Sequence, residues 1–289
     1  SARLPSGAGM IGLEMNDYLS VIIISWDRPR YLRQALTSLI NNTDPRWEAV
    51  IVDCGRGDQF SLVQDLLRGL AYRYLRTPDL SEWPVRAALK WNLGIAVSTG
   101  RFISFLDDDD EKEPDFVHRM CAPLREVHGL RAVACNGVVI DDSSTVRGDL
   151  FSGKASLDRD VLLVPEFITT GQIAFSREAL DDVGGFDEAC DVSEDYEFAL
   201  RLSGLPHHKI GLPLARHRVH DGTKATRHGD VVVDTQAALK YILGKHGVFD
   251  PARCGGCGFK FSGSEGMVGV LPGSGWRIWC RGCHDRVFA

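Results

Sequence analysis

The chain has 289 residues, of which 44% are apolar and 25% charged, and its formal net charge is −6. This composition is typical of a globular protein, and the acidic balance excludes a surface that is basic all over and binds polyanions throughout. No apolar run reaches the roughly 18–20 residues of a membrane span, since runs such as Val21–Ile24 suit a strand. Residues 1–16 are rich in Gly, Ser and Ala and lack a signal-peptide core, so we expect a flexible tail and, by default, a cytoplasmic protein.

The next part of the chain alternates short apolar runs with helical patterns. Ser20–Ser25 is a continuous apolar run, which predicts a strand covered on both faces, and Pro29 opens a helical segment. Gly100 is interpreted as the C-terminal cap of a later helix. This alternation predicts an α/β fold with a mostly parallel central sheet, whose ligands lie beyond the strand C-termini. The other strands are expected at Glu48–Val52, Tyr72–Leu75 and Phe102–Leu106, and the other helices at Gln59–Leu70 and Val85–Ser98.

The second half of the chain is less regular. The Asp-Asp-Ser-Ser stretch before Arg147 predicts a loop between short strands, and amphipathic helices are expected at Glu194–Leu202 and Asp234–Gly244. After Gly247 the composition changes to Gly, Cys and aromatic residues. We therefore divide the chain into a large α/β domain at 17–248 and a small C-terminal domain at 249–289.

Four aspartates, Asp107–Asp110, follow directly on the predicted strand Phe102–Leu106. Adjacent carboxylates repel one another, and a divalent cation with oxygen ligands relieves that repulsion. Mg²⁺ or Mn²⁺ typically takes one or two carboxylates and completes its shell with substrate phosphates. The alternative is a solvated acidic loop, but the position after a buried strand favours a metal site. Asp27 and Asp53 fall at the ends of two other predicted strands, at the same edge of the sheet.

The last part of the chain carries two C-x-x-C pairs, formed by Cys254, Cys257, Cys280 and Cys283. Two such pairs predict a zinc ribbon, and four thiolates leave no open position on the metal, so the Zn²⁺ would be structural. A segment of about 40 residues also needs such a staple. Four reduced cysteines are the alternative. The other four cysteines are scattered singly, which argues against a disulfide framework.

Basic and aromatic side chains interleave within residues 251–289. Three interpretations stay open: contact with nucleic acid through phosphates and stacked bases, a small core for the ribbon, or docking on the large domain. The basic residues are Arg253, Lys260, Arg277, Arg281 and Arg286, and the aromatic ones are Phe259, Phe261, Trp276, Trp279 and Phe288.

An ordered set of motifs resembles the family 2 glycosyltransferases of GT-A fold, over Tyr18 to Gly222. The resemblance implies a metal-dependent enzyme that moves a sugar from a nucleoside-diphosphate sugar to an acceptor hydroxyl, with inversion at the anomeric carbon. The motifs are Ser20–Pro29, Val50–Asp53, Asn92–Ala96, Phe105–Asp110, Val183–Glu188, Ser193–Glu197 and Arg218–His220.

The resemblance also implies a role for each matching position. Asp107 and Asp109 form an Asp-x-Asp pattern in which Asp109 is the direct metal ligand, and His220 is a second contact to the metal or diphosphate. Asp195 would be the catalytic base, and Glu194 would orient the acceptor. The implied donor-binding residues are Ser25, Trp26, Asp27, Asp53, Arg86, Asp107 and Asp108.

Each of these roles has a plainer alternative. Glu194 and Asp195 are also favourable simply as negative charges at a helix N-terminus. Asp53 is also a good turn residue, Arg86 an ordinary surface arginine, and His220 part of a solvated basic loop.

One position departs from the family pattern. Relatives usually carry a second Asp after Asp53, often to read the nucleobase, and this chain has Cys54, so a uracil donor does not follow.

Two other functions compete with the transferase. A sugar-phosphate nucleotidyltransferase is disfavoured because Ser-Trp-Asp-Arg-Pro, not a Gly-rich pattern, follows the first strand. The second is a nucleic-acid-binding zinc-ribbon protein with a degenerate transferase domain. If the ribbon contacts nucleic acid in the active enzyme, the acceptor would be a hydroxylated base in DNA.

Overall fold

A computed structural model describes residues 16–77, 87–153, 155–162, 168–190, 193–220, 241–247, 267–271 and 275–279. Its strands are β1 (Leu19–Ser25), β2 (Trp47–Asp53), β3 (Tyr72–Arg76), β4 (Phe102–Asp107), β5 (Glu111–Lys112), β6 (Ala132–Ile140), β7 (Val146–Leu150), β8 (Ile173–Ser176), β9 (His207–Arg218), β10 (Met267–Leu271) and β11 (Gly275–Trp279). Its helices are α1 (Pro29–Ile40), α2 (Phe60–Val63), α3 (Ala87–Val97), α4 (Phe116–Glu126), α5 (Arg159–Leu162), α6 (Glu178–Val183) and α7 (Glu194–Leu202), with short 3₁₀ turns at Phe151–Gly153 and Thr170–Gln172.

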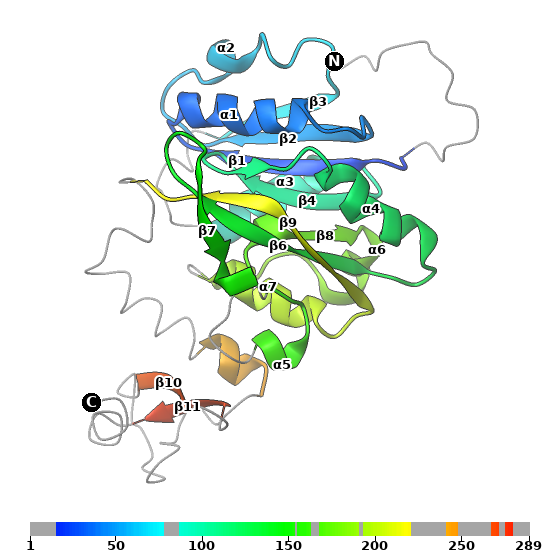
Figure 1. Ribbon diagram of the computed structural model, residues 1–289, viewed down its shortest axis with the longest axis vertical. Helices are drawn as coiled ribbons and strands as arrows, with labels where there is room; N and C mark the ends of the chain where they lie inside the picture. Colours follow the sequence, from blue (N-terminus) through cyan, green and yellow to red (C-terminus); the bar gives the residue numbers. More distant parts are fainter. Residues whose placement is uncertain are drawn as a thin grey trace.

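The central sheet has the strand order β3-β2-β1-β4-β8-β6-β9-β5, with β7 paired to β6 (Figure 1). The block β3-β2-β1-β4 is parallel throughout, as the strand–helix alternation predicts. Beyond it, β8 runs antiparallel to both β4 and β6, and only β6 and β9 form another parallel pair. The sheet is therefore mixed, and the expectation of a mostly parallel sheet was wrong. One reason is the short turn after Ile140, which reverses the chain into β7 without a helical crossover.

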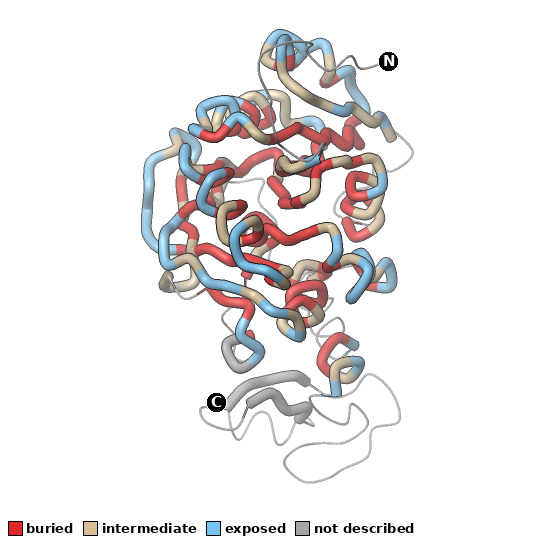
Figure 2. Tube along the Cα trace, turned by 90° about the vertical axis from the view of Figure 1, so that its right-hand side faces the viewer, coloured by how far each residue is buried: buried red, intermediate tan, exposed pale blue. Residues whose placement is uncertain are grey.

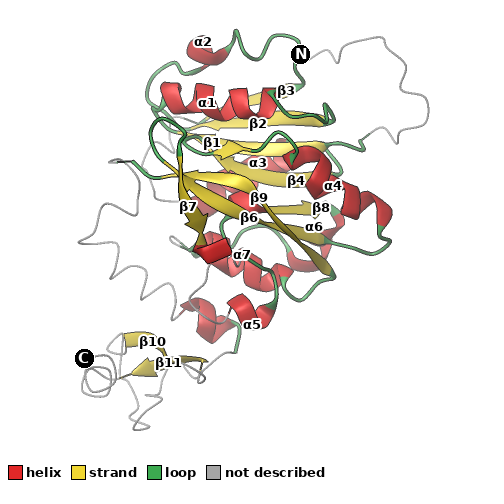
Figure 3. Cartoon of the chain, in the orientation of Figure 1, coloured by secondary structure: helices red, strands yellow, loops and turns green. Residues whose placement is uncertain are grey.

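Helices cover both faces of the sheet (Figure 3), and the residues of β1 show how the two faces are filled. Val21 and Ile23 pack with the buried side chains of α1 and α4, whereas Ile22 and Ile24 pack with those of α3 and α7. Successive side chains of a strand point to opposite faces, so a strand that is buried on both faces must be apolar throughout. The buried segments run through the middle of the molecule in Figure 2, and the exposed ones lie around them.

Two sequence-based expectations about helices were wrong. The helix expected over Gln59–Leu70 is α-helical only in α2. Leu62 is half exposed, and of the apolar side chains in this range only Val63 and Leu67 are buried, which leaves too narrow an apolar face. Gly100 is not a helix cap, since α3 ends at Val97. A Cβ atom at Gly100 would lie 2.6 Å from the carbonyl oxygen of Tyr18, so this glycine permits a close approach to β1.

Several predicted features lie outside the described residues: the tail at 1–15, Arg86, the four ribbon cysteines Cys254, Cys257, Cys280 and Cys283, and most of the helix expected at Asp234–Gly244. Of that helix, 241–244 are described and are helical. In the C-terminal segment the structure describes β10 and β11, an antiparallel pair. Across the described ranges, no helix combines the length and apolar character that a membrane crossing requires.

Candidate active site

Three parallel strands end together at one edge of the sheet. Ser25 at the end of β1 lies in register with Asp53 at the end of β2, and Ile24 lies in register with Asp107 at the end of β4. The predicted acidic residues are therefore brought to one place by the parallel register. This edge is where the ligands of such sheets bind.

Asp53 is fully buried, and both of its carboxylate oxygens are engaged by neighbours. Oδ1 accepts hydrogen bonds from the backbone N–H of Gly55 at 2.9 Å and from Nε2 of Gln59 at 2.8 Å. Oδ2 accepts a hydrogen bond from the hydroxyl of Tyr74 and lies 3.5 Å from Nη1 of Arg76. Burial and this contact raise the pKa of Tyr74. Asp53 thus holds together the turn after β2 and strand β3.

The loop after β1 is tied to the loop after β2 through Asp27. Oδ1 of Asp27 accepts hydrogen bonds from the backbone N–H groups of Arg56 at 3.0 Å and Gly57 at 3.2 Å. Asp27 has a positive φ of 50°, which short polar side chains tolerate better than others. A Cβ atom at Gly55 would lie 2.7 Å from Oδ1 of Asp27, so this contact requires glycine there.

Ser25 and Cys54 line the buried side of the same corner. The Ser25 hydroxyl donates to Oε1 of Gln59 at 3.1 Å. Cys54, which replaces the family's second Asp, is fully buried with its sulfur 3.2 Å from Oγ1 of Thr77, and burial raises its pKa. A buried neutral thiol therefore stands where the family resemblance predicts a carboxylate.

Asp108 is 2% exposed and turns toward the loop after β1. Its Oδ2 accepts a hydrogen bond from the backbone N–H of Trp26 at 2.8 Å, and its Oδ1 lies 3.2 Å from Nη1 of Arg28. Burial and the neighbouring charge of Asp109 raise the pKa of Asp108, although Arg28 opposes that shift. Negative charge at this site is therefore only partly compensated.

Asp109 and His220 meet although 111 positions separate them in the chain. Nε2 of His220 lies 3.0 Å from Oδ2 of Asp109, and Nη1 of Arg28 contacts the same oxygen. His220 lies two residues beyond the end of β9, so this long strand carries it back to the aspartate run. Asp107 is half-buried as the last residue of β4.

Asp109 and His220 are the two described side chains in contact here that could hold a divalent cation. Within the described ranges, no group of three or more His, Cys, Asp or Glu side chains converges as a metal site. A carboxylate and an imidazole are nevertheless suitable donors for Mn²⁺, and Mg²⁺ is commonly held by one or two carboxylates plus substrate phosphates.

The stretch around His220 is not a solvated basic loop, so that alternative was wrong. Arg218 is fully buried in β9, and its backbone N–H donates to Oδ1 of Asp110 at 2.8 Å. Nδ1 of His217 lies 3.2 Å from Oδ2 of Asp110, and the charge of Asp110 raises the pKa of His217 to about 9. Both oxygens of Asp110 therefore bind β9.

Glu194 and Asp195 begin α7. Ser193 before them has a φ of 60°, Glu194 is 8% exposed, and Asp195 is half-buried. Oδ1 of Asp195 accepts a hydrogen bond from the backbone N–H of Tyr196 at 2.8 Å. The hydroxyl of Tyr196 in turn donates to the carbonyl of Leu162 at 2.8 Å, which fixes the first turn of the helix.

An aromatic cluster packs α7 against β4. The rings of Phe198 on α7 and Phe105 on β4 have centroids 6.5 Å apart, and Phe186 contacts both, at 4.5 and 5.2 Å. Phe105 precedes Asp107 by two positions, and Phe198 follows Asp195 by three. The cluster therefore joins the element that bears Asp195 to the strand that bears the aspartate run.

Sequence reasoning assigned no role to Arg28, Gln59 or Arg218. Arg28 and Arg218 lie inside motifs that carried the resemblance, which was the available signal. Gln59 had no such signal, because its contacts with Ser25 and Asp53 arise only when β1 and β2 pair.

Comparisons with known proteins agree with this geometry. A sequence profile described as Glycosyl transferase family 2 matches residues 20–184. An uncharacterized glycosyltransferase of Haemophilus influenzae is 27% identical over 230 residues, which is 78% of this chain and 75% of that protein. Chondroitin synthase of Pasteurella multocida is 25% identical over 231 residues, but the match spans only 24% of its length.

Solved structures share the fold at low sequence identity. S. aureus TarS in complex with UDP-GlcNAc superposes with a TM-score of 0.62 at 17% identity, over 78% of this chain and 65% of that one. The mannosyltransferase PcManGT of Pyrobaculum calidifontis, in complex with GDP-Man and Mn²⁺, gives 0.54 at 16% identity, over 80% and 64%. These matches span less than two thirds of the lengths of those structures, and the similarity extends to the fold alone.

Proposed function

The chain belongs to glycosyl transferase family 2, and we propose that it moves a sugar from a nucleoside-diphosphate sugar to an acceptor hydroxyl with the help of Mn²⁺ or Mg²⁺. The observation that carries this proposal is the convergence of Asp109 and His220, 3.0 Å apart, at the edge where β1, β2 and β4 end. The family assignment leaves the nucleotidyltransferase alternative without support. The preserved pair of candidate metal ligands argues against a degenerate domain.

In this proposal the donor nucleotide lies over the ends of β1, β2 and β4. Ser25, Trp26, Asp27, Asp53 and Asp108 form the wall of that edge, with Arg86 as a further donor contact. The bound UDP-GlcNAc of TarS and the bound GDP-Man of PcManGT are donors of the same chemical class. They support a nucleoside-diphosphate sugar as the donor here.

The residues of the chain divide the chemical work between them. The carboxylate of Asp195 removes the proton of the acceptor hydroxyl while the hydroxyl oxygen bonds to the anomeric carbon. The bond from that carbon to the diphosphate oxygen breaks in the same step, so the configuration inverts. Asp109, Asp107 and His220 would hold the cation, which would supply positive charge to the departing diphosphate. Glu194 orients the acceptor beside Asp195.

Asp195→Asn tests this assignment. We expect kcat to fall at least about 10³-fold, because the amide accepts no proton, while donor binding, measured by calorimetry with Mn²⁺, stays within about twofold. Asp187→Asn is a matched control, because Asp187 is acidic and near α7 but pairs with Lys245 at 2.7 Å. Preserved turnover in Asp195→Asn would rule out Asp195 as the base.

The same proposal includes a structural zinc at Cys254, Cys257, Cys280 and Cys283. It is supported by the spacing of the two C-x-x-C pairs, and all four cysteines that the structure describes elsewhere are buried and free. Metal analysis of the purified protein should find about one zinc per chain. Contact of this segment with nucleic acid is a separate hypothesis, which a DNA-binding assay under varied salt tests directly.

A further inference from the structure

The largest fully buried side chain of the described residues is that of Arg218, and one of its contacts is with Asp109, a candidate metal ligand. Its Nε donates to the backbone carbonyl of Asp109 at 2.8 Å. Its other nitrogens donate to the carbonyl of Asp141, to the carboxylate of Glu111, and to the hydroxyl of Ser144 at 3.1 Å. One guanidinium thus ties the aspartate run to the turn between β6 and β7.

The main chain around Arg218 is held as firmly as its side chain. The N–H of Arg218 donates to Asp110 at 2.8 Å, and the next N–H, that of Val219, donates to the carbonyl of Ile140 at 2.9 Å. His220 follows immediately. The side chain therefore holds Asp109, and the main chain leads directly to the residue that faces Asp109.

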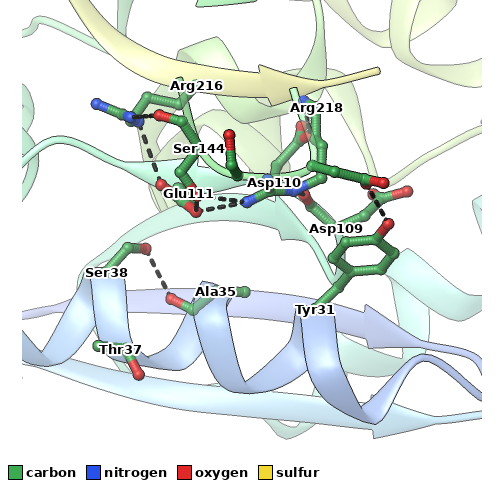
Figure 4. Close-up of polar contacts among 12 residues, drawn as sticks. Tyr31, Ala35, Thr37, Ser38, Asp109, Asp110, Glu111, Ser144, Arg216 and Arg218 are labelled. Carbon is green, nitrogen blue, oxygen red and sulfur yellow. Dashed lines mark hydrogen bonds and ion pairs between the residues drawn. The ribbon is translucent and has the colours of Figure 1, made fainter. Parts of the chain in front are cut away.

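Tyr31 on α1 makes a further contact with Arg218 and also packs against His220. The ring of Tyr31 lies 5.3 Å from the guanidinium carbon of Arg218, and its centroid is 4.7 Å from that of the His220 imidazole. Figure 4 shows Tyr31 rising from α1 toward Arg218, with Glu111 and Asp110 beside the guanidinium. The Tyr31 ring therefore packs against both the guanidinium of Arg218 and the imidazole of His220.

We propose that Arg218 is a positioning residue that sets the spacing between Asp109 and His220, two of the three candidate metal ligands, with Tyr31 as its support. The inference rests on the proposed metal-dependent transfer. An ion pair of a fully buried arginine, such as that of Arg218 with Glu111, is a weak source of stability, since desolvation offsets much of the attraction. Partners that orient metal ligands, by contrast, typically change metal affinity by about 10- to 100-fold when they are replaced.

The variant that separates these roles is Arg218→Lys. It keeps the charge beside Glu111 but replaces the planar fork by a single ammonium, which does not reach all of the acceptors that the guanidinium joins. Arg216→Lys is the matched control. Arg216 lies two positions earlier on the same strand and also contacts Glu111, at 3.2 Å, and the carbonyl of Ser144, at 2.6 Å. Its further ion pair is with Glu113 at 2.7 Å, which is outside the aspartate run.

The measurement is a titration of the full chain with Mn²⁺ alone, followed by electron paramagnetic resonance, which reports both free Mn²⁺ and the symmetry of the bound ion. We expect Arg218→Lys to weaken Mn²⁺ binding by about tenfold or more and to alter the spectrum of the bound ion. Arg216→Lys should stay within about twofold of the parent protein. Equal effects of the two variants would overturn the positioning role.

Two further outcomes are informative. If Arg218→Lys does not fold by circular dichroism, Tyr31→Leu decides instead, because Tyr31 is only half-buried and its loss leaves no buried charge. That variant should weaken Mn²⁺ binding at least about threefold, with unchanged circular dichroism, and an unchanged affinity would overturn the proposal. If the parent protein binds Mn²⁺ neither alone nor in the presence of UDP or GDP, the metal part of the proposed function fails, and this inference fails with it.

Discussion

Glu197 on α7 and Asp109 after β4 are both buried acids, but their surroundings differ. Glu197 is fully buried and receives three basic side chains: Arg201 at 2.6 Å, Lys245 at 2.8 Å and His246 at 3.2 Å. Asp109 shares Arg28 with Asp108 and also contacts His220. Glu197 thus has three basic partners, one of which, Lys245, it shares with Asp187, whereas Asp108 and Asp109 share one arginine.

The pKa of Glu197 and that of Asp108, the neighbour of Asp109, shift in opposite directions. Burial by itself raises the pKa of Glu197, but hydrogen bonds from His246, Arg201 and Lys245 outweigh it and lower the pKa to about 2. Burial and the charge of Asp109 raise the pKa of Asp108. The basic partners of Glu197 thus outweigh its burial, whereas the single arginine beside Asp108 does not outweigh burial and a second carboxylate.

The largest expected effect is that of Asp109→Asn. Removal of this carboxylate takes away the proposed direct metal ligand, so kcat/KM should fall at least about 10³-fold. Stability should stay within about 1 kcal/mol, because a source of repulsion disappears with the charge. Transfer assays and urea unfolding measure the two quantities. Asp65→Asn, at an exposed aspartate paired with Arg33, is the control, and a large loss of stability in Asp109→Asn would break the comparison.

The next largest effect is the contribution of Glu197 to the unfolding free energy and to its dependence on pH. Its pKa is about 2 in the folded chain against an ordinary value of 4.5 for glutamate, so its stabilisation is fully present above about pH 4.5 and is lost as the pH falls toward 2. The difference corresponds to roughly 3 kcal/mol. Glu197→Gln should lower the unfolding free energy at pH 7 by roughly that amount and flatten its decline between pH 5 and 3. The exposed Glu126→Gln should do neither, and an unchanged acid decline in Glu197→Gln would refute the assignment.

The smallest effect should be that of Asp53→Asn on the unfolding free energy. This variant compares Asp53 with Asp109, which lies at the same edge of the sheet. The amide keeps an acceptor for Gly55 and Gln59 but loses the charge beside Arg76, so we expect a loss of about 1–2 kcal/mol. Mn²⁺ affinity should not change. A loss of Mn²⁺ binding as large as in Asp109→Asn would place Asp53 among the acids that hold the cation.

The parts of the fold that followed from the sequence are those whose pattern is local. Strands β1, β2 and β4 are apolar on both faces, and α7 has a regular stripe, so their bounds were predicted to within two residues. The acidic edge followed in turn, because parallel strands end together. The pairing of Asp109 with His220 agrees with the resemblance, although spacing alone did not indicate it.

The parts that did not follow depend on contacts between distant segments. The direction of β8 is set by its two neighbours in the sheet, and its own four residues carry no signal for it. Arg28 reaches the aspartate run across about 80 positions, and Arg218 does so across about 110. Gly100 resembles a helix cap in sequence, and only the approach of Tyr18 explains it.

Residues 241–247 have a practical consequence for anyone who shortens this chain. Ile242 and Leu243 belong to the core beside α3 and α7, and Lys245 and His246 are two of the three partners of Glu197. A catalytic fragment cut where the family motifs stop, after His220, would expose that apolar surface and leave a buried carboxylate with Arg201 alone. A stable catalytic fragment therefore has to extend through Gly247, well past His220, the last residue of the large domain with a proposed chemical role.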